Sequence, residues 1–176
     1  MSHPFALLTH AATVGVSGSR RPGPASLAAL RAALGAVPSG ALVCTGCARG
    51  IDAATRRLVP TSRLRVFSAA RSGLPVRAAL AARSVACVRA VASAHSGVWL
   101  SFPASACPPG LRPSSSSSAC FRGLGSGTWA SLAFAVGLGL PAFVFLPPGA
   151  PVPAGWPLQP AGSGWWVHRP PQLGLW

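Results

Sequence analysis

Carboxylate side chains are almost missing from this sequence of 176 residues, because Asp52 is the only one. Glu, Lys, Asn and Tyr are absent, and the 15 residues counted as Lys or Arg are all Arg, which gives a formal net charge of +14. Glycoside hydrolysis uses a pair of carboxyl groups, and sites for Ca²⁺ and Mg²⁺ are built largely from carboxylate oxygens. The composition therefore excludes paired-carboxylate catalysis and a side-chain cage for these ions.

The position of Asp52 narrows the chemistry further. A Rossmann site for NAD normally holds the ribose with an acidic residue at the end of its second strand, but residues 44–46 at that place are Cys-Thr-Gly. A Ser-His-Asp triad would have to use Asp52, which stands where a helix is expected to begin. We interpret Asp52 as structural, capping backbone N–H groups or pairing with Arg49 or Arg20. We expect no cofactor.

Length and hydrophobicity indicate one folded domain, since domains average about 150 residues and half of this chain is hydrophobic. The five cysteines are an odd number, and no cleavable signal peptide opens the chain, so we expect free thiols in a reducing cytoplasm. Cys44 and Cys47 are spaced like half a metal site without a second half, so no metal is expected. The apolar stretch 129–146 is broken by Gly137 and Pro141, which disfavours a membrane span.

Short apolar runs alternate with helical patterns along the chain. The runs, each expected to form a buried strand, are 13–17, 41–45, 64–67, 98–102 and 142–146. The first expected helix begins near Pro24 or Ser26 and ends near Gly35, and the others are 51–58, 75–95 and 128–138. Strands that alternate with helices form a parallel sheet covered on both faces. The sequence therefore predicts an α/β fold, a Rossmann-like three-layer sandwich with a mostly parallel sheet of about five strands.

The chain divides into an expected Rossmann-like domain over 1–148 and an extended C-terminal tail over 149–176, rich in Pro and Trp. The Trp residues of the tail are Trp156, Trp165, Trp166 and Trp176. Monomers rarely expose apolar surface of this extent, so we expect the tail to pack on the domain or on another subunit, and a homo-oligomer. The Ser-rich segment 101–122 is expected to be a loop.

Glycine-containing loops follow three of the expected strands and lead into expected helices. Their candidate phosphate- or nucleotide-binding residues are Gly18, Ser19, Arg20, Gly46, Arg49, Gly50, Gly125, Ser126, Gly127 and Thr128. Glycine allows close approach of a ligand, helix N-termini favour anions, and Arg suits phosphate. Such loops meet at the carboxyl ends of parallel strands. Trp99 and Trp129 are expected near that end as base contacts, and Arg83 is expected to face it while Arg89 faces solvent.

These loops also resemble a known family. Residues 14–20 (Val-Gly-Val-Ser-Gly-Ser-Arg) and 45–54 (Thr-Gly-Cys-Ala-Arg-Gly-Ile-Asp-Ala-Ala) resemble the DNA-processing protein A (DprA, or Smf) group of the SLOG superfamily. Gly-Ser-Gly-Thr at 125–128, followed by a helix and the strand at 141–146, is similar as well. The resemblance covers roughly 12–148. It implies a Rossmann-like domain that binds single-stranded DNA, or a nucleotide as other SLOG domains do.

The resemblance also bears on catalysis. The LOG cytokinin-activating enzymes of the same superfamily carry Pro-Gly-Gly-x-Gly-Thr-x-x-Glu, in which the Glu serves hydrolysis of an N-glycosidic bond. When this motif is aligned on Gly127 and Thr128, the Glu position is Ser131 here. The resemblance thus implies that the phosphate-binding part is kept while the catalytic carboxylate is missing, so we expect that the chain is not an enzyme.

Three functions remain open at this point. The charge of +14 attracts phosphates, so the leading hypothesis is non-catalytic binding of single-stranded DNA or a nucleotide. The second hypothesis is a nucleotide-processing enzyme of the LOG or deoxyribosyltransferase type, in which only Asp52 could supply a carboxylate. The third is a structural or assembly protein that uses its Trp-rich tail. No membrane partner is expected.

Overall fold

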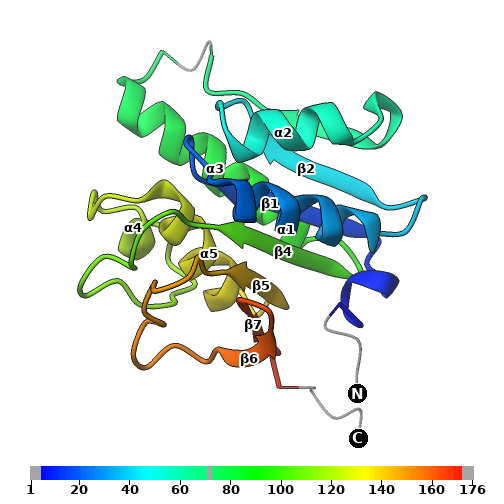
Figure 1. The fold of residues 1–176 in the computed structure, drawn as a ribbon. Coiled ribbons are helices and arrows are strands. Elements are labelled where there is room, and N and C mark those ends of the chain that lie inside the picture. Colours follow the sequence, from blue (N-terminus) through cyan, green and yellow to red (C-terminus); the bar gives the residue numbers. More distant parts are fainter. Residues whose placement is uncertain (1–4, 71–72, 172–176) are drawn as a thin grey trace, which may run out of the picture.

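The computed structural model, which describes residues 5–70 and 73–171, confirms the expected α/β class (Figure 1). A seven-stranded, mostly parallel sheet has the strand order β3-β2-β1-β4-β5-β7-β6. The strands are β1 (Thr13–Gly18), β2 (Leu42–Gly46), β3 (Leu64–Phe67), β4 (Gly97–Phe102), β5 (Ala142–Phe145), β6 (Gln159–Gly162) and β7 (Trp165–His168). The helices are α1 (Pro24–Gly35), α2 (Ile51–Leu58), α3 (Val76–Ala92), α4 (Ser117–Cys120) and α5 (Gly127–Gly137), with 3₁₀ turns η1 (Leu8–His10) and η2 (Thr61–Arg63).

The strand order reverses beside β1. The chain builds β1, β2 and β3 outward in one direction, crosses back through α3, and then adds β4 and β5 on the other side of β1, all in parallel. Helices α1 and α2 cover one face of the sheet, and α3 and α5 cover the other (Figure 1). In open α/β sheets, ligands bind outside the carboxyl ends of the strands at such a reversal.

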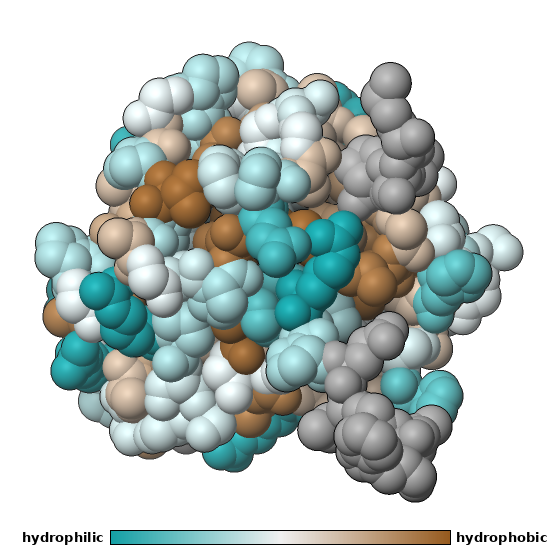
Figure 2. Space-filling model, turned by 90° about the horizontal axis from the view of Figure 1, so that it is seen from below, coloured by the Kyte–Doolittle hydropathy of each residue, from teal (hydrophilic) through white to brown (hydrophobic). Residues whose placement is uncertain are grey.

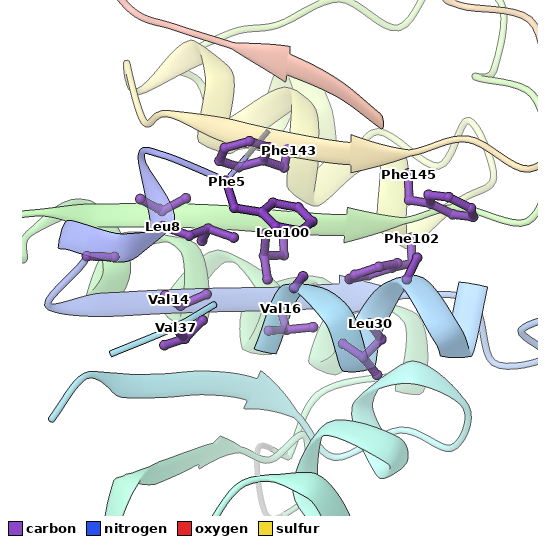
Figure 3. Close-up of a cluster of buried hydrophobic side chains, with 14 of the residues drawn as sticks. Phe5, Leu8, Val14, Val16, Leu30, Val37, Leu100, Phe102, Phe143 and Phe145 are labelled. Carbon is purple, nitrogen blue, oxygen red and sulfur yellow. The ribbon is translucent and has the colours of Figure 1, made fainter. Parts of the chain in front are cut away.

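Strands β1, β2, β4 and β5 are largely buried on both faces, as their continuous apolar runs predicted. The same expectation for residues 64–67 is wrong, because β3 is an edge strand on which Arg65 and Val66 are exposed. Along β4, Leu100 and Phe102 face the α1 side, whereas Trp99 faces the α3 side. On the α1 side, phenylalanine rings from β4, β5 and the N-terminal segment pack with aliphatic side chains of β1 and α1 (Figure 3). Because neither face of the central strands is open to solvent, a ligand-binding site is expected at the ends of the strands.

The sheet has more strands than the five expected, because residues 159–168 of the tail form β6 and β7. This hairpin turns through Gly162, Ser163 and Gly164, all with positive φ, and β7 pairs antiparallel with β5. Trp165 is buried, and its ring lies edge-on to rings whose centroids are between 5.2 and 6.3 Å away. These rings belong to Phe5, Phe102, Phe143 and Phe145. The tail therefore shares the core of the preceding domain.

The other tail tryptophans are covered to different degrees. Trp156 is buried, its ring centroid lies 5.6 Å from that of Trp129, and its Nε1 donates to the carbonyl of Leu111 at 3.2 Å. Trp166 is half-buried, and Trp176 lies outside the described residues. As far as residue 171, the apolar tail thus packs on its own chain.

The segment 101–122 is more structured than a simple loop. It contains α4, and Leu111 and Cys120 are buried. All five cysteines are free. Within residues 5–70 and 73–171, no helix combines the length and apolar character needed to cross a bilayer.

Candidate functional site

A cleft with a volume of about 680 Å³ opens at the carboxyl ends of β1 and β2. Its walls are the loop after β1, the inner side of α3, the segment before α5 and the first turn of α5, and Trp99 of β4 is part of its lining. The cleft therefore lies at the reversal of strand order, where open α/β sheets bind ligands. Its volume falls in the range of about 300–1,000 Å³ that is typical of small-molecule sites.

Most of the predicted loop residues meet in this one cleft. Those that line it are Gly18, Ser19, Arg20, Gly46, Gly125, Ser126, Gly127 and Thr128. Arg49 is different, because it is exposed and does not line the cleft. The structure therefore sets Arg49 apart from the other predicted loop residues, and its part in ligand binding stays a prediction.

Gly50 also lies outside the cleft, but it shapes the loop that forms one wall. Its φ is +78°, and a Cβ atom on Gly50 would overlap the carbonyl oxygen of Ser19 and the backbone of Arg20. The N–H of Ile51 donates to that same Ser19 oxygen at 3.0 Å. The start of α2 therefore packs directly against the backbone of the first loop. Gly50 has a structural role, because only a residue without a side chain permits this contact.

Backbone hydrogen bonds hold the first loop in place. The N–H of Ser19 donates to the carbonyl of Phe102 at 2.9 Å, which ties the end of β1 to the end of β4. The Oγ of Ser19 accepts from the N–H of Arg21 at 2.9 Å. Arg20 lies between them with an exposed side chain. A rigid turn thus presents a cationic side chain at the mouth of the cleft.

The opposite wall is the N-terminus of α5. Ser126 caps the helix by accepting from the N–H of Trp129 at 3.4 Å. Cβ atoms built on Gly125 and Gly127 would meet no heavy atom within 4 Å, so the space before the helix is open. The free N–H groups and positive dipole end of an α-helix favour an anion at such a position. This wall can therefore hold a phosphate.

Ser131, at the position of the LOG glutamate, also lines the cleft. Its hydroxyl donates to the carbonyl of Gly127 at 2.8 Å within the helix. Ser131 supplies no carboxylate for a hydrolytic reaction. Among the described residues that line the cleft, Asp52 is the one that carries a carboxylate.

Asp52 is buried, and its partner is neither Arg49 nor Arg20. Its Oδ2 lies 3.1 Å from Nη1 of Arg83 and accepts from the N–H of Ala48 at 3.2 Å. The expected pairing with Arg49 or Arg20 is therefore wrong, because the partner Arg83 comes from α3, 31 residues away along the chain. The contact with a backbone N–H agrees with the structural role expected for Asp52. Burial raises the pKa of Asp52 above its ordinary value, although the Arg83 guanidinium and the Ala48 N–H oppose that rise.

Arg83 lines the cleft and Arg89 is exposed, as expected from their positions on the helix. The sequence did not predict two further features of the cleft, which lie on α3 and on the segment before α5. Arg77 adds an exposed cation to the wall, and Val76 and Leu124 give it an exposed apolar rim. The signal for Arg77 was its place in the first turn of the expected helix. The apolar rim could not be predicted from the sequence, because its two residues are 48 positions apart in the chain.

Both tryptophans predicted to contact a base are buried in the structure. Trp129 is fully buried, does not line the cleft, and donates from Nε1 to the carbonyl of Ser105 at 2.9 Å. Its assignment as a base contact is wrong, because large aromatic rings are drawn into the core. Trp99 does line the cleft, but only 1% of its surface is exposed, and its ring packs on Gly15. Neither ring presents an open face to a base.

Fold and site together define an α/β, Rossmann-like protein with a cleft at its strand ends that is lined by glycines, arginines and the N-terminus of α5. The chain matches no protein-family model, no curated protein and no solved structure with which it was compared. The resemblance to the DprA group therefore rests on the motifs at 14–20, 45–54 and 125–128. In the part of the chain that the structure describes, no three His, Cys, Asp or Glu residues gather as a metal site would require.

Proposed function

We propose that the protein binds a phosphate-bearing ligand, single-stranded DNA or a nucleotide, without catalysing a reaction on it. The observation that carries this proposal is the meeting of the Gly18–Arg20 loop and the α5 N-terminus in one cleft. These two features come from segments more than 100 residues apart. Each favours an anion by a different mechanism, a side-chain charge in one case and backbone N–H groups in the other.

The charges around the cleft support an anionic ligand. Arg20, Arg77 and Arg83 line it, and the nearby carboxylate of Asp52 is already paired. The apolar rim of Val76 and Leu124 suits the base or sugar of a nucleotide, since ligand pockets combine apolar walls with a few polar groups. The high charge of the whole chain also attracts a longer polyanion such as single-stranded DNA.

A nucleotide-processing enzyme is less well supported. Such an enzyme needs a carboxylate at the reacting carbon, and within the described cleft Asp52 is the only one. Oδ2 of Asp52 is engaged by Arg83 and by the N–H of Ala48, so this oxygen is not free to attack. We therefore propose no hydrolysis of an N-glycosidic bond.

An assembly role through the tail is also less well supported. Trp156 and Trp165 are buried by their own chain. Edge strand β6 carries Pro160 and a register shift next to it, and both features oppose pairing with another sheet. Seen from below, the hydrophobic residues form several separate patches with hydrophilic residues between them (Figure 2). We propose that any homo-oligomer uses another surface.

The experiment that tests the function begins with the purified full chain. The absorbance ratio at 260 and 280 nm and mass spectrometry of released material show whether it carries DNA, a nucleotide or nothing. Affinity for the identified material is then measured for Arg20→Ala, with Arg49→Ala as the control. We expect Arg20→Ala to weaken binding by about 1–3 kcal/mol, the size of a lost charge-assisted hydrogen bond. Equal losses in the two variants would show that only overall charge matters.

A further inference from the structure

Arg83 occupies an unusual place for an arginine, in the wall of the cleft with only 12% of its side chain exposed. A buried guanidinium is costly unless it is paired. Asp52, whose side chain is 6% exposed, supplies that partner at 3.1 Å. The only carboxylate side chain of the sequence is thus placed beside this one arginine out of 15.

The pair uses only part of the guanidinium. An arginine side chain has five N–H donors. Nη1 of Arg83 donates to Asp52, and Nη2 donates to the hydroxyl of Ser84 at a long 3.4 Å. Nε is buried and has no hydrogen-bond partner among the described residues. Asp52 is therefore not enough to satisfy Arg83, and donors remain for a second oxyanion.

Other groups of the same wall share this lack of an acceptor. Ser17 and Trp99 both line the cleft, and Ser17 Oγ and Trp99 Nε1 are buried without a partner in the part of the chain that the structure describes. Gly15, the residue two before Ser17 on β1, is the register partner of Trp99 on β4. A buried donor that lacks an acceptor destabilises the fold, so this wall fits a ligand group rich in acceptor oxygens.

Gly46 makes room for the pair at the end of β2. A Cβ atom at Gly46 would overlap Nη1 of Arg83 and Oδ2 of Asp52. The φ of Gly46 is not in the left-handed region, so the space, and not the backbone conformation, accounts for glycine. The end of β2 is therefore fitted to the guanidinium of α3.

From this geometry we infer that Arg83 is an anion-binding side chain of the cleft and that Asp52 is its positioning residue. The inference rests on the proposed function and adds to it an oxyanion contact from α3, which is separate from the Gly18–Arg20 loop and from the N-terminus of α5. Asp52 fixes one edge of the guanidinium, and the remaining N–H groups donate to the oxygens of a phosphate. The chemical class of the ligand group is an oxyanion with at least two acceptor oxygens, since Arg binds such groups in a bidentate manner.

The test follows the side-chain Nε–H signals of the wild-type, ¹⁵N-labelled protein while inorganic phosphate is added, with chloride at equal ionic strength as the reference. Arg83→Lys assigns the Arg83 signal. We expect that signal to shift and to saturate together with the backbone amides of residues 125–128. The Nε–H signal of Arg31, an exposed residue of α1 outside the cleft, should follow the chloride reference.

The titration distinguishes a wrong assignment of Arg83 from a wrong proposed function. If the amides at 125–128 shift and saturate while Arg83 does not, the proposed function stands and the assignment of Arg83 is wrong. If neither responds to phosphate, both are wrong.

Variants test the two roles. Arg83→Met should weaken phosphate binding about tenfold, as loss of a charge-assisted hydrogen bond does, whereas Arg31→Met should change it less than about twofold through the general field. Because Arg83→Met leaves Asp52 unpaired, the double variant Arg83→Met/Asp52→Asn keeps the test valid if the single variant does not fold. The assignment of Arg83 is overturned if the folded variant binds phosphate like Arg31→Met.

Asp52 is tested by comparing two replacements. Asp52→Asn keeps an oxygen that can accept from Arg83 and removes the competing charge, so it should bind phosphate at least as tightly as wild type. Asp52→Ala frees Arg83 to move and should bind more weakly than Asp52→Asn. This difference should disappear when Arg83 is replaced by Met in both. Equal affinities of Asp52→Asn and Asp52→Ala would overturn the positioning role.

Discussion

The indole ring of Trp99 on β4 lies against Gly15 on β1, so closely that a Cβ atom on Gly15 would overlap ring atoms Cε3 and Cζ3. The two residues are register partners in the parallel pair of strands. A side-chain methyl of Val91 from α3 borders the same space at 2.9 Å from that Cβ position. A residue without a side chain at position 15 thus lets the central strands and α3 close together beneath the cleft.

Gly15→Ala should therefore destabilise the fold by overpacking. We expect a loss of about 1–3 kcal/mol in the free energy of unfolding, as is typical when atoms are forced into a filled core. The matched control is Gly35→Ala at the end of α1, where a Cβ atom meets no heavy atom within 4 Å. Urea unfolding of both variants measures the difference. Equal stabilities would contradict the packing of Trp99 on Gly15.

Gly50 offers a test of how the first loop is supported. Gly50→Ala combines the strain of a sparsely populated backbone conformation with positive φ, about 1–3 kcal/mol, with a collision against Ser19 and Arg20. Gly110→Ala has nearly the same φ, +76° against +78°, but open space around the new Cβ. We expect both variants to lose stability and only Gly50→Ala to bind phosphate more weakly. Unchanged phosphate affinity in Gly50→Ala would show that the loop does not depend on this support.

The tail gives a third prediction. Trp165→Ala should lower the free energy of unfolding by about 3–5 kcal/mol, the usual cost of removing a buried aromatic ring, because Trp165 packs among four phenylalanine rings. Trp166→Ala on the same strand should cost clearly less, since Trp166 is half-buried. Chemical denaturation compares the two. Similar small losses would mean that the hairpin is only loosely attached.

Asp52 should make the stability of the fold depend on pH in an unusual direction. Burial raises the pKa of its carboxyl group, so the folded state binds the proton more tightly than the unfolded chain. Its contribution to stability is then fully present below the unfolded pKa of about 3.9 and is lost as the pH rises through the folded pKa. Wild type should gain stability relative to Asp52→Asn as the pH is lowered from about 7 to about 3.

The pKa itself can be measured directly. Because Asp52 is the only side-chain carboxyl group, a single ¹³Cγ signal of aspartate reports its titration. A folded pKa below the ordinary value, or a wild type that loses stability in acid relative to Asp52→Asn, would contradict the prediction.

The sequence was sufficient to predict the central strands, because apolar runs with β-branched residues, set between glycines, are typical of buried strands. It was insufficient for β6, where Pro160 and Gly162 are poor strand formers and the strand forms by pairing with β7. It was also insufficient for side-chain direction. Arg49 stands inside the recognisable motif but does not line the cleft, whereas Arg83 reaches Asp52 only because α3 crosses behind β1 and β2.

If the cleft at the strand ends binds phosphate, backbone amide signals of the labelled protein will show it as inorganic phosphate is added at constant ionic strength. The largest saturable shifts should then fall at Ser19, Arg20 and residues 125–128. Shifts spread evenly over the arginines outside the cleft, such as Arg31 and Arg169, with no saturation at those positions, would contradict phosphate binding in the cleft.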